Sequence, residues 1–358
     1  MKKIGFWTLI FLLFSGGLSL LKSNTEIVEK HYSQGFYYYY SKTLNFCTAY
    51  IPFSIGDIFY IIVGIYLLLK LTKTIRQSPL LKDKIIACTG FTIKAYTLFF
   101  ILFNLTWGLN NYRTSLQDKL AIGLSYDTTD LIALTTKLSK LVNIQQYQLT
   151  NNTAQAVVNR QSLDQIFKKA QKGIETTAIQ LNLYRYFPTS INSSLYSTPL
   201  TYAGFGGYIN PFTIEAQVNN QIPNLTMIIT ASHEISHQMG YARESDANFI
   251  GYLATYNQKE LIDQYAANIY ALRFCLSELY RTDSAKADQI VASLYPGVRI
   301  NIYENTVFWN KHKTIIDRAF KHIYGAFLKT NNQKEGIRSY NKFLALLINY
   351  NKKVSIYS

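Results

Sequence analysis

The sequence predicts three N-terminal transmembrane helices followed by a mainly α (α+β) domain that contains one small β-sheet. Three observations lead to this prediction. The first 108 residues hold three long apolar segments, residues 128–145 and 161–184 have the pattern of helices, and residues 196–219 are rich in turn-forming residues and short β-prone runs. The chain of 358 residues therefore divides into a membrane region, residues 1–108, and a domain, residues 109–358.

The three apolar segments cover residues 4–21, 54–69 and 85–107. A helix needs about 20 apolar residues to cross a bilayer, and only the second segment is clearly short of that length. Because the first segment follows Met-Lys-Lys, a cleaved signal peptide is the alternative interpretation. The length of the apolar stretch and the lack of a small-x-small cleavage site after Leu21 favour a retained span.

Basic residues in the loop between the second and third segments predict the orientation. Cytoplasmic loops of membrane proteins carry an excess of lysine and arginine. This loop has five such residues: Lys70, Lys73, Arg76, Lys82 and Lys84. The N-terminal Lys2 and Lys3 agree with a cytoplasmic N-terminus. We therefore expect a multi-pass protein of the cell (inner) membrane, with the lipid bilayer as a partner and an extracytoplasmic C-terminal domain.

The net charge of +15, from 36 basic and 21 acidic residues, does not indicate a nucleic-acid partner. The basic residues are scattered and no nucleic-acid-binding motif accompanies them, so attraction to anionic lipid headgroups is the preferred interpretation. Tyr37–Tyr40 fit either a segment in the outer membrane interface or a tyrosine-rich packed loop. Cys47 and Cys275 would both lie outside and could form a disulfide, although nothing in the sequence requires one.

Within the domain, leucines at helical spacing predict a helix over residues 128–145, and a second helix is expected over residues 161–184. Residues 196–219 predict two or three short strands or a hairpin. Helices are then expected over residues 225–239 and 242–258, on either side of Gly240. The chain past Leu261 is expected to be mostly helical, with breaks near Pro296 and Lys334.

The sequence SHEISHQMGYARESDANF, residues 232–249, contains two histidines four residues apart with a glutamate beside the first. On a helix, His233 and His237 lie one turn apart on the same face and can direct their rings at one ion. Glu234 is rotated by about 100°, within reach of a water molecule on that ion. This His-Glu-x-x-His pattern is typical of zinc hydrolases. We therefore predict a Zn²⁺ site with His233 and His237 as ligands and Glu234 as general base.

The third ligand has to come from the residues after the second histidine. Metzincins place a histidine six residues further on, but that position holds Arg243, whose cation cannot coordinate a metal. Two acids remain, Glu244 and Asp246. If a helix begins near Ala242, Asp246 points away, whereas Glu244 shares a face with short side chains that permit close approach to the histidine helix: Ala247, Asn248 and Gly251. Glu244 is the predicted ligand and Asp246 the alternative.

The sequence Glu-Ser-Asp-Ala-Asn, residues 244–248, resembles the Glu-x-x-Ala-Asp element of gluzincin-type membrane peptidases. This resemblance implies a zincin-like domain in which Glu244 binds zinc and Asn248 supports a ligand histidine. Two departures limit it. Asn replaces Asp, which adds no charge to raise the basicity of the imidazole, and the two elements almost abut here, whereas those peptidases separate them widely.

Nearly the whole chain resembles a bacterial membrane family, domain of unknown function 3810. The resemblance covers the three apolar segments, the core of His-Glu-x-x-His and Glu-x-x-Ala-Asn, and four further sequences: IPFSIGD, WGLNNYR, NPFTIEAQVN and GIRSYNKFLALL. It implies a zinc peptidase domain and leaves the substrate open.

Two features around the motif bear on catalysis. The sequence GFGGYINPF, residues 204–212, lies where zincins place the edge strand that pairs with substrate, and a tight hairpin without a ligand is the alternative. A developing oxyanion needs a hydrogen-bond donor, for which Tyr340 is the first candidate and Tyr208 and Arg338 are the others. His312 and His322 are expected to be surface residues.

These observations together predict a membrane-anchored zinc-dependent metallopeptidase that hydrolyses a peptide or protein. The alternative is a non-catalytic membrane scaffold stabilised by zinc. Structural zinc sites are usually closed by four protein ligands, often cysteines, and no cysteine lies near the motif. A transporter, suggested by Asp57 and Lys94 in the apolar segments, is disfavoured because three spans are few.

Overall fold

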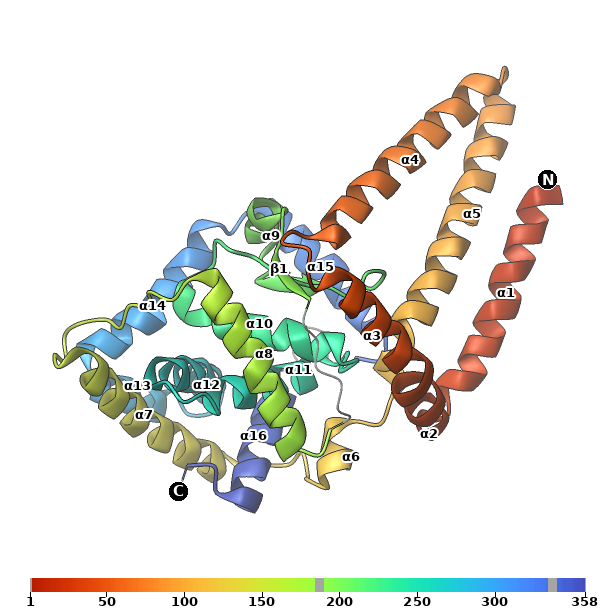
Figure 1. Ribbon diagram of the computed structural model, residues 1–358. Coiled ribbons are helices and arrows are strands. Elements are labelled where there is room, and N and C mark those ends of the chain that lie inside the picture. The colour runs from red at the N-terminus through yellow and green to blue at the C-terminus, as the bar shows by residue number, and fades with distance from the viewer. Residues whose placement is uncertain (1, 184–189, 334–339, 358) are drawn as a thin grey trace.

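The computed structural model describes residues 2–183, 190–333 and 340–357 of the chain (Figure 1). Three long helices extend from one side of a mostly helical domain. These are α1 (Lys2–Lys22), α4 (Ile55–Gln77) and α5 (Leu81–Thr106). Each is long and apolar enough to cross a membrane, and little of its apolar surface is covered by the rest of the chain. The structure therefore agrees with the three predicted spans and suggests insertion into a membrane.

The predicted basic loop between the second and third spans is a tight turn. α4 continues beyond residue 69 and ends at Gln77, because Ser78 is extended before Pro79, which cannot continue a helix. The five basic residues consequently lie on the adjoining ends of α4 and α5. The N-terminus and this turn lie at the same end of the three helices, and the domain lies at the other end (Figure 1).

The tyrosine-rich segment is helical and packs on the domain. It comprises α2 (Thr25–Ile27), the π-helical η1 (Val28–Phe36) and α3 (Tyr37–Thr48). Tyr37 is fully buried and donates a hydrogen bond to the Gln238 carbonyl at 2.8 Å, whereas Tyr39 is exposed. The segment is thus a packed element with one side in contact with the domain. Cys47 is exposed on α3 and Cys275 is buried in the core, so the disulfide considered from the sequence is absent and both are free thiols.

Two buried carboxylates attach the domain to the first turn of α4. Glu215 accepts hydrogen bonds from two successive backbone N–H groups of that turn, at 3.2 and 2.5 Å. Asp57 accepts from the Leu195 N–H at 2.6 Å, from the Ser194 hydroxyl at 3.0 Å and from the Tyr208 hydroxyl. A carboxylate at a helix N-terminus is favourable because it meets unpaired N–H groups and the positive end of the helix dipole. Asp57 therefore serves as an anchor, which removes one of the two reasons for considering a transporter.

The helices of the domain surround a central pair, α10 (Asn224–Gln238) and α11 (Glu244–Tyr256). α10 contacts α8, α11, α12 and the sheet, and its apolar run is buried in the main core. The other domain helices are η2 (Gly108–Tyr112), α6 (Leu116–Leu120), α7 (Thr128–Thr150), α8 (Leu163–Gln180), α9 (Ser197–Ala203), α12 (Leu261–Thr282), α13 (Ser284–Ser293), α14 (Pro296–Lys311), α15 (Ile315–Thr330) and α16 (Tyr340–Val354).

The predicted helices appear with small shifts at their ends. α7 and α8 each begin at a capping box, formed by Asp127 and by Ser162. α8 stops at Gln180 and not at residue 184, because Asn182 adopts a left-handed conformation (φ +49°) that turns the chain away. The break at Pro296 is confirmed, since α14 begins there, and the break near Lys334 falls outside the described residues.

The sheet has three short strands and lies against α10. β1 (Ile191–Ser193) pairs in parallel with β3 (Ala216–Val218), and β2 (Gly207–Ile209) pairs antiparallel with β3 on its other side. β2 and β3 lie within the range predicted for strands, and β1 precedes it. β2 therefore forms an edge of the described sheet, and its Gly207 lies against Glu234 of the His-Glu-x-x-His motif.

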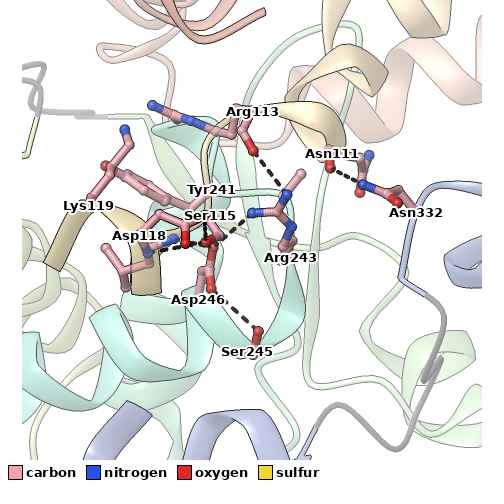
Figure 2. A network of polar contacts seen from close by, with 12 residues as sticks. Asn111, Arg113, Ser115, Asp118, Lys119, Tyr241, Arg243, Ser245, Asp246 and Asn332 are labelled. Carbon is pink, nitrogen blue, oxygen red and sulfur yellow. Dashed lines mark hydrogen bonds and ion pairs between the residues drawn. The ribbon is translucent and has the colours of Figure 1, made fainter. Parts of the chain in front are cut away.

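A polar network fixes the turn between α10 and α11 (Figure 2). Arg113 donates to the Met239 carbonyl at 3.2 Å, and its guanidinium lies 4.4 Å from the centre of the Tyr241 ring. Arg243 donates to the Arg113 carbonyl at 2.9 Å. Asp246 accepts from the backbone N–H of Leu116, the first residue of α6. The chain after α5 thus contacts the turn between α10 and α11 through Arg113 and the start of α6.

Glu29 of η1 balances the positive charges of Arg113 and Lys119 beside this network. It forms two hydrogen bonds with Arg113, at 2.8 and 2.9 Å, and an ion pair with Lys119. Burial alone would raise the pKa of Glu29, but the hydrogen bonds and charges of Arg113 and Lys119 outweigh burial and lower it from 4.5 to about 2. Burial and the charge of Arg113 lower the pKa of Lys119 to about 8. The ion pair therefore stabilises the fold only while Glu29 is ionised.

Replacing Glu29 with Gln should reduce the amount by which the free energy of unfolding falls between neutral and acid pH. Because the pKa of Glu29 is depressed in the folded state, its contribution is complete above pH 4.5 and is lost as the pH falls towards about 2. Glu29→Gln removes this titration and leaves Arg113 buried without its carboxylate, which should cost about 3 kcal/mol at neutral pH. Thermal midpoints of the full chain in detergent, at neutral pH and at about pH 3, measure both effects.

Glu26→Gln is the matched control, because Glu26 is an exposed glutamate on the same segment. It should keep the wild-type stability and the wild-type dependence on pH. If Glu29→Gln lost as much stability in acid as Glu26→Gln does, the ion pair would not hold the turn as inferred.

Candidate metal centre

The helix α10 forms where apolar residues repeat ahead of the motif, and it ends where Gly240 takes up a left-handed conformation (φ +79°). Its length places His233 and His237 one turn apart, as the sequence predicts. Their ring Nε2 atoms lie 3.0 Å apart. The His237 side chain is buried and His233 is slightly more exposed, at 6% and 15%. Two imidazoles thus point at one place near the surface of the domain.

Glu244 reaches the same place from the first residue of α11. Its Oε2 lies 3.4 Å from the His233 Nε2, and its Oε1 lies 3.6 Å from the His237 Nε2. Ligand atoms about 2.0–2.1 Å from a tetrahedral zinc ion are roughly 3.3 Å from one another. The two ring nitrogens, and the Glu244 oxygen nearest each of them, lie at about this spacing. The three side chains therefore converge closely enough to share one ion, and they fit the metal that the motif implies.

The close approach of α11 to α10 makes this convergence possible. Gly251 faces the backbone of His233, and a Cβ at this glycine would lie only 3.0 Å from the His233 nitrogen. The face of α11 that carries Glu244 is thus the one that meets α10, as expected. Asp246 lies on the other side, where it accepts from the Leu116 N–H at 3.3 Å and lies 3.9 Å from Arg243. The structure brings Glu244, and not Asp246, to the two histidines.

The backbone orients His237. Its Nδ1 lies 2.7 Å from the Tyr241 carbonyl, which is held in place by the polar network described above. Such a partner on the second ring nitrogen fixes the ring and its tautomer. The resemblance implies that Asn248 supports a ligand histidine, but Asn248 accepts a hydrogen bond from Tyr270 at 2.9 Å. That role falls to the Tyr241 carbonyl, because the turn between the two helices is short enough to fold back onto the ring.

Glu234 lies beside the three donors with one oxygen unused. Its side chain is buried, and Oε2 has no hydrogen-bond partner among the described residues. Its ligand atom lies within 4.8 Å of those of His233 and His237. Burial raises its pKa to about 6, against the opposing charges of the two histidines. A buried carboxylate oxygen without a partner is costly, and a water molecule or an ion at this site would satisfy it.

Glu244 and His237 shift each other's pKa values in opposite directions. Burial opposes charge on both partners, but hydrogen bonds from His233 and His237 hold the pKa of Glu244 well below its usual value. The carboxylate of Glu244 in turn raises the pKa of His237 to about 9, against the effect of burial. Positive charge placed between Glu244 and the imidazoles, as a proton or a cation provides, therefore stabilises the ionised carboxylate.

Of the three candidate oxyanion donors, the structure describes the side chain of Tyr208 only. Tyr340 begins α16, but its side chain lies outside the described residues, as does the whole of Arg338. Tyr208 donates to Asp57 at the base of α4, because the alternation of β2 turns Gly207 towards Glu234 and Tyr208 away. Tyr208 is therefore not the donor. His322 is exposed, as expected. His312 follows α14 and is half-buried, with its ring against Tyr202.

Sequence reasoning missed Tyr324. This residue lies on α15, and its hydroxyl donates to Glu244 Oε1 at 2.7 Å. Its ring packs edge-on against Phe205, next to the start of β2. One tyrosine among 29 carries no signal of its own. Only the packing of α15 over the site brings it to the carboxylate.

The comparisons with known proteins concern the family. The family model described as Protein of unknown function (DUF3810) matches residues 32–348. No curated protein and no solved structure matches the chain. The matched range begins in η1, includes α4, α5 and both helices of the candidate metal centre, and ends within α16. Since it covers most of the 358 residues, the chain belongs to the family described as Protein of unknown function (DUF3810).

Proposed function

We propose that this protein is a membrane-anchored, zinc-dependent metallopeptidase. The observation that supports the proposal best is the convergence of His233, His237 and Glu244, whose donor atoms are 3.0–3.6 Å apart at the surface of a helical domain. Two histidines and one carboxylate are the ligand set of gluzincin-type zinc enzymes. The zincin-like fold of the domain is part of this proposal.

The composition of the site favours catalysis over a purely structural role. A structural zinc ion is usually closed in by four protein ligands, often cysteines, whereas a catalytic ion keeps one position open. Within the described ranges the cysteine nearest in sequence to the motif, Cys275, is buried in the main core on α12. The carboxylate of Glu234 would border the open position. In a purely structural zinc site, the buried Glu234 carboxylate, whose Oε2 has no partner among the described residues, would have no role.

Glu234 is the proposed general base. When bound, a zinc ion would supply a Lewis acid that lowers the pKa of water and polarises a carbonyl group. Glu234 would accept a proton from the attacking water and deliver it to the leaving amine. Its burial favours this exchange, because a carboxylate whose pKa is raised to about 6 can both take up and return a proton near neutral pH. Tyr324 would hold Glu244 in position, and Tyr340 remains the predicted oxyanion donor.

A peptide or protein is the proposed substrate class. β2 is an edge strand of the described sheet and passes over Glu234, so that a Cβ at Gly207 would lie 2.8 Å from Glu234 Oε1. An extended chain can add to such an edge through backbone hydrogen bonds. This addition would place a peptide bond next to the base and the metal.

The proposed location is the cell (inner) membrane, with the N-terminus in the cytoplasm and the domain outside. The N-terminus and the basic α4–α5 turn share one end of the three long helices, and the domain lies at the other (Figure 1). The excess of basic residues at that end supports a cytoplasmic side.

Metal analysis of the full-length chain tests the ligand set. The protein purified in detergent should hold about one zinc ion per chain. Glu244→Ala should weaken zinc binding by more than the roughly 10–100-fold that loss of an outer-sphere partner costs. Asp246→Asn is the matched control, because Asp246 lies on the other side of α11 and the amide still offers an acceptor to the Leu116 N–H, so zinc content should be unchanged. Equal zinc loss in the two variants, or no zinc in the wild type, would contradict the assignment.

Hydrolysis tests the role of Glu234. Glu234→Gln keeps the size of the side chain and should retain zinc, but cleavage of a quenched-fluorescent casein should fall by about 10²–10⁴-fold, as loss of a general base predicts. Glu215→Gln, on the buried carboxylate that holds α4, controls for the loss of a buried charge. Zinc-loaded wild type without any cleavage of unfolded proteins or peptides would favour the scaffold. Full activity in Glu234→Gln would exclude the mechanism.

A further inference from the structure

The helix α15 exposes a continuous apolar stripe. Four large side chains follow one another at positions i, i+4, i+7 and i+11, with exposed fractions between 37% and 63%: Ile316, Phe320, Ile323 and Phe327. At about 100° per residue they fall on one side of the helix. A contiguous apolar patch of this kind on a folded domain marks a contact surface and is not expected to face water.

This stripe is continuous with the membrane-spanning helices. The ring of Phe327 packs edge-on against Phe103 of α5, with ring centres 5.7 Å apart. Phe103 lies three residues before the end of α5, about 5 Å along the helix axis. Figure 1 shows α15 next to the base of the protruding helices. One end of the stripe therefore lies at the level where the span leaves the bilayer.

The two other sides of α15 face the domain and water. Asp317 and Leu328 are buried against the domain, on the side that also carries Tyr324 to Glu244. The third side is mixed: it exposes Arg318, His322 and Lys329 together with two alanines and Ile315, the first residue of the helix. The exposed basic residues on and just before α15 are Lys311, Lys313, Arg318, Lys321 and Lys329. Asp317, the one acid of the helix, is buried and paired with Lys321 at 2.7 Å. A basic rim beside an apolar stripe is the composition of helices that lie in an anionic membrane surface.

We propose that α15 lies in the membrane interface, with its apolar stripe among the acyl chains and its basic side at anionic lipid headgroups. The contact with α5 places the stripe next to lipid and not next to bulk water. A second copy of the chain is a poorer occupant, because pairing two such stripes would bring two basic rims together. Since the same helix carries Tyr324, this arrangement puts the candidate metal centre one helix away from the bilayer surface.

Spin-label accessibility on the full-length chain tests the proposal. In a background of Cys47→Ser and Cys88→Ser, with the buried Cys275 retained, single labels are placed by Ile323→Cys and by Phe320→Cys. Ile144→Cys on α7 is the matched control, because this isoleucine is also on a helix and 55% exposed, compared with 63% for Ile323. The protein is reconstituted in nanodiscs of phosphatidylcholine and phosphatidylglycerol.

The labels at Ile323 and Phe320 should be more accessible to oxygen than to a water-soluble nickel chelate, at a depth of about 5–10 Å in the headgroup and acyl boundary. The label at Ile144 should show the reverse. Chelate accessibility at Ile323 equal to that at Ile144 would overturn the proposal. Protection of Ile323 from both reagents would also overturn it, because protein and not lipid would then cover the stripe.

Discussion

The close packing of α11 on α10 is the constraint on which the candidate site depends. His233 and His237 alone form a pair on one helix, and a third donor must arrive from another element within about 3–4 Å. The lack of a side chain at Gly251 lets the two backbones approach where His233 sits. Glu244 then meets both imidazoles within one turn of the start of its helix. A side chain at this position would crowd the His233 backbone and push the two helices apart.

The same contact is held from outside by buried charge. Arg113 is almost fully buried and would be costly without Glu29, which comes from the segment between the first two spans. Through Arg113 and the Tyr241 ring this pair reaches the carbonyl that orients His237. The segments next to the membrane are thus part of the support of the site. A second buried cluster, which joins Leu18, Tyr37 and Trp107 to Ile214 and Ala242, has the same effect.

The long apolar helix α4 is also attached to the domain, through the polar groups of its first turn. Asp57 and Glu215 bind the first turn of α4 to the loops around the sheet, and Tyr208 on β2 shares in this contact. The strand proposed to receive substrate and the long apolar helix α4 are therefore neighbours. The domain is therefore held against the long helices at two separate places, the first turn of α4 and the end of α5 next to α15.

The sequence by itself determined the features that depend on local pattern. Hydropathy gave the three long apolar helices, helical periodicity gave α7 and α8, and the four-residue spacing gave two histidines on one face. Even the choice of Glu244 over Asp246 followed from helical geometry, because each acid has a fixed angle on α11.

Only the tertiary structure decided which distant groups support these residues. The Tyr241 carbonyl and not Asn248 orients His237, Tyr208 is turned towards Asp57, and Tyr324 reaches Glu244 across 80 residues of chain. No periodic pattern in the sequence predicts these contacts. Each depends on how separate elements pack and on which buried polar groups must find partners. The sequence specifies a local face, and the fold selects what that face meets.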